Sequence, residues 1–305
     1  MKIKAFFAIA GSLFFIGAAN RQPKVVSVLE ILDVDSGVRE VVREFNHLIE
    51  APNWMPDGRW LVFNSEGKLY RLSLEKPRAK PVLIDTRFAT TCNSDHVVSA
   101  DGKYIALSNI PSGNHGSHVY TVPCEGGMPH LVVEFCPAYV HGISPDNKFL
   151  VYCADRANNY DVYVCPFAGG KEVRLTTAAG HDDAPEYSPD GKHIWFNSAR
   201  RGLMQIWRMN ADGSEQTQMT ADSTRNSWFP HVSPDGKQVI FIAYDPGISK
   251  PSEHLANKKV ELRMMPAAGG EPLTLVQFLG GQGTINVNSW SPDSRRVAFV
   301  SYRLK

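Results

Sequence analysis

Six copies of a short turn motif, at nearly even spacing, constrain this chain more than any other feature. Two copies read Ser-Pro-Asp-Gly-Lys and the other four differ from it at one or two positions; the six aspartates are Asp57, Asp101, Asp146, Asp190, Asp235 and Asp293. Successive aspartates are 44 or 45 residues apart, except for a last interval of 58. Proline presets φ, and Asp and Gly favour turn conformations, so each motif predicts a tight hairpin turn in which the Asp has a structural role.

The segments between the turns have the pattern of four short strands. In the fourth repeat an apolar strand enters the turn and an alternating strand, 194–198, leaves it. A third strand at 205–209, a second turn at 210–214 and a weak fourth strand ending at Thr220 follow. Four short strands every ~45 residues are typical of a propeller blade. We therefore predict an all-β fold, a six-bladed β-propeller with four strands per blade.

The two ends of the chain predict how the ring closes. Only two strands can follow Trp290, whereas residues 25–33 and 38–45 form an extra strand pair before the first motif. We expect these N-terminal strands to complete the last blade, which would leave no free sheet edge. The longer last interval comes from a polar insert at 247–257, which either covers the funnel as a lid or is a surface excursion.

The repeat resembles that of the TolB-like six-bladed β-propeller (PD40, WD40-like) family. The resemblance rests on Ser-Pro-Asp-Gly-Lys and on Ile-Trp-Arg-Met-Asn-Ala-Asp-Gly-Ser at 206–214, and it extends over residues 24–305. Related propellers bind partner proteins in the periplasm, gate prolyl-oligopeptidase-type peptidases, or act as oligogalacturonate lyases. TolB itself has an N-terminal α/β domain before its propeller, and this sequence has no segment of that kind. A peptidase is not expected, because the sequence contains no Gly-x-Ser-x-Gly motif.

The first residues have the pattern of a secretory signal peptide. Lys2 and Lys4 precede an apolar stretch at 5–19 that ends in small residues and is short for a membrane span. We predict a signal peptide at 1–19, a single propeller domain at 20–305, no membrane span after signal removal, and a periplasmic or secreted location. Five cysteines permit up to two disulfides in such a compartment, but their spacing does not select a pairing.

The net charge and the topology limit the kinds of partner and the place of the binding site. The formal net charge of +1 argues against nucleic acid as a partner. The loops between strands two and three and those between blades share one face, opposite the Ser-Pro-Asp-Gly turns. Eight of the ten histidines fall on that face, at the funnel mouth of the propeller. Loops on a rigid scaffold commonly carry binding sites, so this face is the candidate site.

Specific roles can be assigned to residues on this face. Imidazoles and carboxylates that converge there suit Zn²⁺ or Mn²⁺, and a metal with a nearby base would permit β-elimination from a uronate. The predicted metal ligands are His96, His141 and His231. The predicted catalytic residues are Asp183 or Glu186 as carboxylate ligand or general base, and Arg200 or Arg201 as an anion clamp. The predicted ligand-binding residues are Asn53, His181, Tyr160 and Trp228, the last two as stacking surfaces.

Two functional classes remain open from the sequence. The first is an exported binding protein that recognises a protein partner or an oligosaccharide through the His-rich funnel face. The second is a metal-dependent carbohydrate-active enzyme that resembles oligogalacturonate lyase or cleaves glycosides. The glycine-rich segment 280–284 lacks the lysine and the helix of a phosphate-binding loop, and it is expected to be a tight loop between blades.

Overall fold

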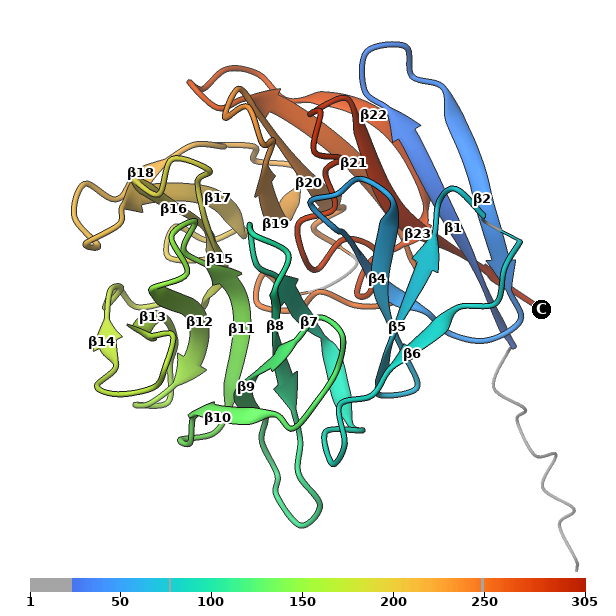
Figure 1. The fold of residues 1–305 in the computed structure, drawn as a ribbon. Coiled ribbons are helices and arrows are strands. Elements are labelled where there is room, and N and C mark those ends of the chain that lie inside the picture. The colour runs from blue at the N-terminus through green and yellow to red at the C-terminus, as the bar shows by residue number, and fades with distance from the viewer. Residues whose placement is uncertain (1–23, 77, 248–249) are drawn as a thin grey trace, which may run out of the picture.

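Six antiparallel sheets surround a central axis like the blades of a propeller in the computed structural model, which describes residues 24–76, 78–247 and 250–305 (Figure 1). The described residues include no helix, and therefore none that could cross a membrane. The six-bladed all-β prediction is confirmed. The predicted signal peptide at 1–19 lies outside the described residues.

Five blades are formed by consecutive strands. Blade one contains β3 (Glu50–Trp54), β4 (Trp60–Ser65), β5 (Lys68–Ser73) and β6 (Val82–Ile84). Blade two contains β7 (Cys92–Val98), β8 (Tyr104–Asn109), β9 (His118–Pro123) and β10 (His130–Val133). Blade three contains β11 (Ala138–Ile143), β12 (Phe149–Asp155), β13 (Tyr160–Pro166) and β14 (Val173–Arg174). Blade four contains β15 (Asp182–Tyr187), β16 (His193–Ser198), β17 (Gln205–Asn210) and β18 (Thr217–Gln218). Blade five contains β19 (Asn226–Val232), β20 (Gln238–Tyr244), β21 (Lys258–Pro266) and β22 (Leu273–Gly280).

The sixth blade joins the two ends of the chain, as predicted. Strand β23 (Arg296–Leu304) pairs with β1 (Val25–Asp33), which in turn pairs with β2 (Arg39–Phe45). The β1–β23 pairing runs without interruption from Val25↔Leu304 to Asp33↔Arg296. The innermost segment of this blade is irregular and is joined to β23 through the bridge between Trp290 and Val297. Figure 1 shows β1 and β2 beside β23.

The Ser-Pro-Asp-Gly motifs are tight turns. In one of them, Ser233 Oγ donates to Asp235 Oδ1 (2.7 Å), and the same carboxylate accepts from Lys237 N (3.1 Å). Gly236 follows with φ near +72°, a conformation that glycine adopts without strain. The residues just before the six turn aspartates line one axial cavity of about 290 Å³; they are Pro56, Ala100, Pro145, Pro189, Pro234 and Pro292. All six turns therefore surround the axis on one face.

The five named inner strands each contain a β-bulge, which decides where their side chains point. The pairing register shifts between Glu50 and Asn53 in β3, and equivalent shifts occur in β7, β11, β15 and β19. Ala51, Ala184 and Phe229 have positive φ at these places. A bulge leaves residues unpaired and re-aims the side chains beside it. In each of these strands only two or three paired residues separate the bulge from the turn, and the bulges shape the funnel mouth.

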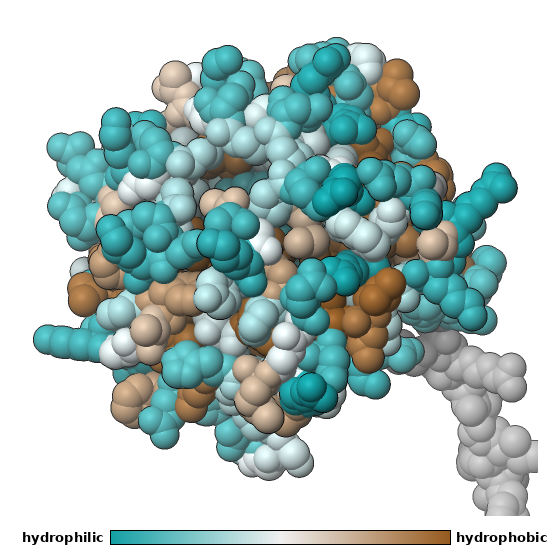
Figure 2. Space-filling view, in the orientation of Figure 1, coloured by the Kyte–Doolittle hydropathy of each residue, from teal (hydrophilic) through white to brown (hydrophobic). Residues whose placement is uncertain are grey.

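Hydrophobic side chains fill the space between blades. The largest fully buried ones are Trp195, Trp228, Tyr152, Tyr244, Phe63, Phe196, Phe229, Phe241 and Phe299. The surface is more polar than this core. Figure 2 shows hydrophilic residues over most of the visible face, with hydrophobic residues in small separate groups. The rigid packed ring therefore holds the polar loops of the funnel mouth in place.

Candidate functional site

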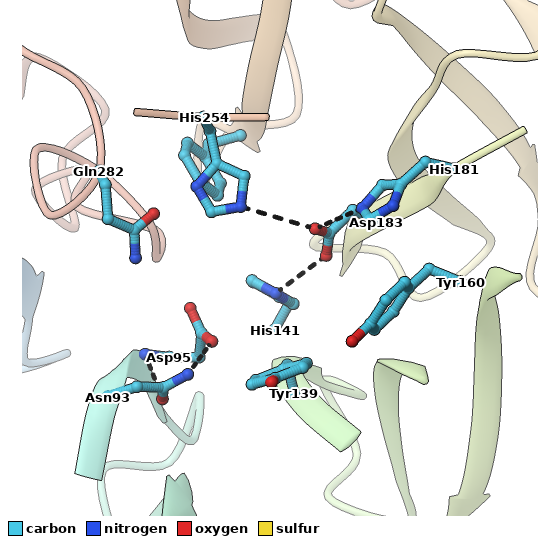
Figure 3. Close-up of a pocket in the computed structure, with 10 residues that line it drawn as sticks. Asn93, Asp95, Tyr139, His141, Tyr160, His181, Asp183, His254 and Gln282 are labelled. Carbon is cyan, nitrogen blue, oxygen red and sulfur yellow. Dashed lines mark hydrogen bonds and ion pairs between the residues drawn. The ribbon is translucent and has the colours of Figure 1, made fainter. Parts of the chain in front are cut away.

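A polar cavity of about 300 Å³ opens on the face opposite the six turns. It is lined by Asn93, Asp95, Tyr139, His141, Tyr160, His181, Asp183, Phe229, His254 and Gln282 (Figure 3). These residues come from the inner strands at or near their bulges, from loops between blades, from the β20–β21 loop and, for Tyr160, from the start of β13. The cavity therefore lies on the face that the sequence nominated for binding.

Asp183 is the centre of this cavity. His141 Nε2 lies 3.4 Å from Asp183 Oδ1, and His181 Nε2 lies 3.1 Å from Asp183 Oδ2. His254 Nε2 approaches the same Oδ2 at 3.9 Å (Figure 3). The backbone N–H of Ala184 donates to Oδ1 at 2.7 Å. One carboxylate thus gathers three imidazoles that come from three different blades.

The bulges explain this convergence. In β11 the pairing register changes between Val140 and Gly142, so His141 is the unpaired residue of the bulge. In β15 the register changes just after Asp183, and Ala184 takes a φ of +48°. Both side chains are thereby directed toward the axis instead of into the spaces between blades.

The charges of the cluster follow from these contacts. Burial alone would raise the pKa of Asp183, but hydrogen bonds from His141 and His181 outweigh it and hold that pKa well below its usual range. Burial opposes protonation of His141 and His181, yet the adjacent carboxylates prevail and raise the pKa of both imidazoles. For His254 burial prevails and lowers the pKa. The cluster therefore combines an ionised carboxylate with imidazoles of two different basicities.

A second buried carboxylate, Asp95, faces the cluster from β7. Asn93 Nδ2 donates to its Oδ2 at 2.5 Å, and Asn286 Nδ2 lies 3.4 Å from its Oδ1. Burial raises the pKa of Asp95, and the neighbouring Asp183 adds to that effect. Two carboxylates therefore share a cavity whose described lining includes no lysine or arginine.

A group able to hold a metal lies beside the cavity, but it is not the predicted one; two of its members, His141 and Asp183, line the cavity, and the third, Cys153, does not. One ligand atom each from His141, Cys153 and Asp183 lie within 4.8 Å of one another, and all three residues are buried. Burial, together with the nearby Asp183, raises the pKa of the Cys153 thiol well above its usual value. Of the three predicted metal ligands, only His141 belongs to this group.

His231 lies elsewhere, in a polar belt across the axis. Its Nδ1 is 2.6 Å from Glu186 Oε2 and its Nε2 is 2.5 Å from the carbonyl oxygen of Ile285. Both ring nitrogens are therefore engaged by groups of the protein, and neither is free for a metal. Glu186 is also occupied, by Val232 N and Asn288 Nδ2. The structure therefore places His231, expected as a metal ligand, and Glu186, expected as a carboxylate ligand or base, in contacts between blades.

Asn53 belongs to the same belt. Its amide donates to the carbonyl oxygen of Asn288 and accepts from Val98 N (2.6 Å). It lines the axial cavity on the turn side and not the funnel cavity. The structure therefore places Asn53 between blades as a connecting residue.

His96 is directed away from the cluster, although it occupies the same position as His141 relative to the turn Asp. In β7 the register change falls upstream, between Cys92 and His96, and His96 is paired opposite Leu107. Its side chain is completely buried, and neither ring nitrogen reaches hydrogen-bond geometry. Burial lowers the pKa of His96 to about 4. A larger bulge in one blade thus separates two histidines that the sequence aligns.

The remaining predicted residues divide between the cavity and the blades. His181 and Tyr160 line the cavity, with ring centroids 4.9 Å apart. Trp228 is fully buried behind His254, at 4.5 Å between ring centroids, so it has no free face for a ligand. Arg200 pairs with Asp182 at 2.8 Å and lies over the Trp207 ring, and Arg201 bonds Gln218. The two arginines stabilise blade four and do not line the funnel cavity.

Sequence reasoning assigned no role to seven contributors to the site, which are Asn93, Asp95, Tyr139, Cys153, Phe229, His254 and Gln282. Cys153 comes from a second strand, β12, where it reads as an ordinary core residue. All five cysteines are free, so the structure contains none of the disulfides that the sequence permitted. The insert supplies His254, and the backbone of Leu255 beside it accepts from Tyr244 Oη at 3.1 Å.

The segment 280–284 is a tight loop between blades, as expected. Gly281 has a φ of +111°, and a Cβ added there would lie 2.1 Å from the carbonyl oxygen of Leu255. At Gly283, whose φ is +88°, a Cβ would lie 2.5 Å from Tyr302 Oη. The glycines therefore permit close packing of the loop against its neighbours.

Comparison with known proteins agrees with the fold. The model of the TolB beta propeller domain family (PD40) matches residues 93–266. An uncharacterized protein of Agrobacterium fabrum is 44% identical over 277 residues, covering 90% of this chain and 92% of the relative. A solved structure with a provisional TolB assignment, from Agrobacterium tumefaciens, has a TM-score of 0.86 and 43% identity and covers 92% of this chain and 99% of that one.

More distant relatives have lower sequence identity to this chain. The Tol-Pal system protein TolB of Francisella tularensis is 28% identical over 240 residues, which are 76% of this chain and 54% of the relative. The chain thus spans about half the length of the TolB relatives it matches. An oligogalacturonate lyase solved with manganese shares the fold alone, with a TM-score of 0.54 and 12% identity, covering 92% of this chain and 97% of that one. On the family match and the 44% identical relative, the chain belongs to the TolB β-propeller family.

Proposed function

We propose that this protein is an exported binding propeller whose funnel cavity recognises a polar group on a protein partner or an oligosaccharide. The observation that carries the proposal is the convergence of His141, His181 and His254 on Asp183 in one cavity. Such a cluster supplies hydrogen-bond donors and acceptors at fixed positions, which is how polar specificity is built into a pocket. A periplasmic or secreted location is part of the proposal and rests on the signal-like pattern of residues 1–19.

The walls of the cavity support recognition of a hydroxyl-rich or amide-bearing group. Tyr139 and Tyr160 lie on one side, and Asn93 and Gln282 add amide donors and acceptors. Tyrosine combines an apolar ring with a polar tip, a combination suited to sugar rings and to peptide groups.

A second candidate function is a metal-dependent carbohydrate-active enzyme. The specific observation in its favour is the buried group of His141, Cys153 and Asp183, which could hold a metal ion. A lyase acting on uronates also needs a cation to pair with the substrate carboxylate. Since no described cavity-lining residue is Lys or Arg, the metal itself would have to supply that charge. We therefore place binding first.

The test is ligand capture by the mature protein, using an oligosaccharide array and pull-down from a periplasmic extract. Tyr160→Ala changes the cavity wall, and Tyr104→Ala is the matched control, because Tyr104 is partly exposed and lies outside the cavity. We expect a captured ligand to bind Tyr160→Ala at least tenfold more weakly and Tyr104→Ala unchanged. Equal binding by both variants would remove the funnel cavity from the proposal. Release of unsaturated sugar products from acidic oligosaccharides would favour the enzyme instead.

A further inference from the structure

Three different kinds of metal donor meet beside the funnel cavity, and two of them, His141 and Asp183, line it. His141 comes from the inner strand β11, Cys153 from its neighbour β12, and Asp183 from β15 of the next blade. Cys153 and His141 are held close because Tyr139, two residues before His141, pairs directly with Cys153. Asp183 is brought against them by the bulge of β15. The three donors are therefore fixed by packed strands and not by mobile loops.

We propose that His141, Cys153 and Asp183 form a Zn²⁺ site that leaves one coordination position open toward the funnel cavity. The inference deepens the proposed function and rests on it for the role of the cavity, since the open position is where a ligand group would bind. The site differs from the histidine trio expected from the sequence, of which only His141 is retained.

The spacing of the donor atoms fits a tetrahedral ion. Zinc bonds of about 2.0–2.3 Å place ligand atoms roughly 3.3–3.8 Å apart in a tetrahedron. His141 Nε2 and Asp183 Oδ1 are already 3.4 Å apart, and all three donor atoms lie within 4.8 Å of each other. Small side-chain adjustments of Cys153 would complete the geometry. Three protein ligands with a fourth open position are the usual arrangement of zinc sites that bind a further group.

The mixture of donors selects the metal. A thiolate and an imidazole favour zinc over magnesium or calcium, which take oxygen ligands. A thiolate and a carboxylate together carry two negative charges, which a divalent cation neutralises in a site where all three ligands are less than a tenth exposed. No lysine or arginine among the described lining residues could do the same.

The residues around the three ligands also support a zinc site. His141 Nδ1 and His254 Nδ1 are buried without a hydrogen-bond partner, so the imidazoles of the cavity are incompletely satisfied by the protein. His181 holds the other oxygen of Asp183, which would orient the carboxylate toward the ion. Such contacts to a ligand residue commonly tune metal affinity. His181 is therefore a positioning residue in this proposal.

The experiment uses the mature full-length protein, stripped with a chelator and titrated with Zn²⁺ and separately with Co²⁺. Zinc binding is followed by calorimetry, and cobalt binding by absorption, since a Cys ligand produces a sulfur-to-cobalt charge-transfer band. We expect one equivalent of either ion, with the charge-transfer band present. Cys153→Ser should lose the band and weaken zinc binding at least tenfold. Cys165→Ser is the matched control, because Cys165 is equally buried in the same blade but lies outside the group, and it should keep both.

Asp183→Asn provides a second variant of nearly equal size in case Cys153→Ser fails to fold, and it should also weaken zinc binding at least tenfold. Failure of the wild type to bind zinc, cobalt binding without the band, or a band that persists in Cys153→Ser would each overturn the zinc site. The proposed function is judged separately by ligand capture. If the protein captures a ligand but binds no zinc, the proposed function stands and the zinc site is wrong. If it binds zinc but captures no ligand, the zinc site stands and the proposed function is wrong.

Discussion

His231 Nδ1 lies 2.6 Å from Glu186 Oε2, and this buried contact joins the inner strands of blades four and five near the propeller axis. Glu186 also accepts from Asn288 Nδ2 at 2.7 Å, and His231 bonds the carbonyl of Ile285, so the inner segment of blade six is held as well. Residues that the sequence suggested for metal binding and catalysis thus connect three blades. The funnel cluster and this belt are separate polar groups with separate consequences.

Glu186→Ala should destabilise the fold strongly. Removing this carboxylate leaves His231 Nδ1, Val232 N and Asn288 Nδ2 without their partner, and an unsatisfied buried polar group typically costs about 1–3 kcal/mol. We expect a fall of that size in the free energy of unfolding measured by denaturant titration. The double variant Glu186→Ala, His231→Ala should lose less than the sum of the single losses. A loss below about 1 kcal/mol for Glu186→Ala would show that the belt is not structural.

His96 should make stability depend on pH in the mildly acidic range. Its pKa falls from 6.5 to about 4 on burial, so the unfolded chain binds a proton between these values while the folded protein does not. Stability should therefore decrease as the pH falls from about 7 to 4, by about 3 kcal/mol from this group. His96→Phe should flatten this part of the pH profile of the unfolding free energy. The exposed control His130→Phe should leave the profile unchanged, and an unaltered slope in His96→Phe would contradict the assignment.

Gly142→Ala should be destabilising, because Gly142 lies next to the β11 bulge and packs closely against β12 and β15. An added Cβ would lie 2.7 Å from Val151 Cγ1 and 3.2 Å from the carbonyl oxygen of Pro185. Overpacking of this kind costs roughly 1–3 kcal/mol. Gly247→Ala is the control, because a Cβ there meets nothing within 4 Å. Thermal or denaturant unfolding should separate the two variants, and equal stability would mean that β11 and β15 can move apart at no cost.

Deletion of residues 296–305 should open the ring. Strand β23 pairs with β1 and also with Trp290, so its removal exposes an unpaired edge on each side. Unpaired edges promote association of sheets between chains. Size-exclusion chromatography should show oligomers or aggregates, and the single unfolding transition should be lost. A monomer that melts like the full chain would indicate that blade six does not need β23.

Much of the fold could be predicted because its signals are local and repeated. Turns such as Ser233-Pro-Asp-Gly236 need particular residues at particular positions, and their spacing determines the number of blades. The pairing of β1 with β23 followed from counting strands at the two ends. The site was predictable only as a face of the ring, since each loop's place follows from topology whereas the direction of its side chains does not.

The sequence by itself determined the six-bladed ring, its closure and the face that carries the polar residues. Only the tertiary structure decided which of those residues meet. His96 and His141 occupy the same place in the repeat, yet bulges of different size direct one into the core and the other toward Asp183. A bulge re-aims the side chains beside it, and its size cannot be read from the spacing of the turn motifs. The pairing of β12 with β11 places Cys153, a residue of a second strand, beside His141 and Asp183, a position that no loop motif indicated.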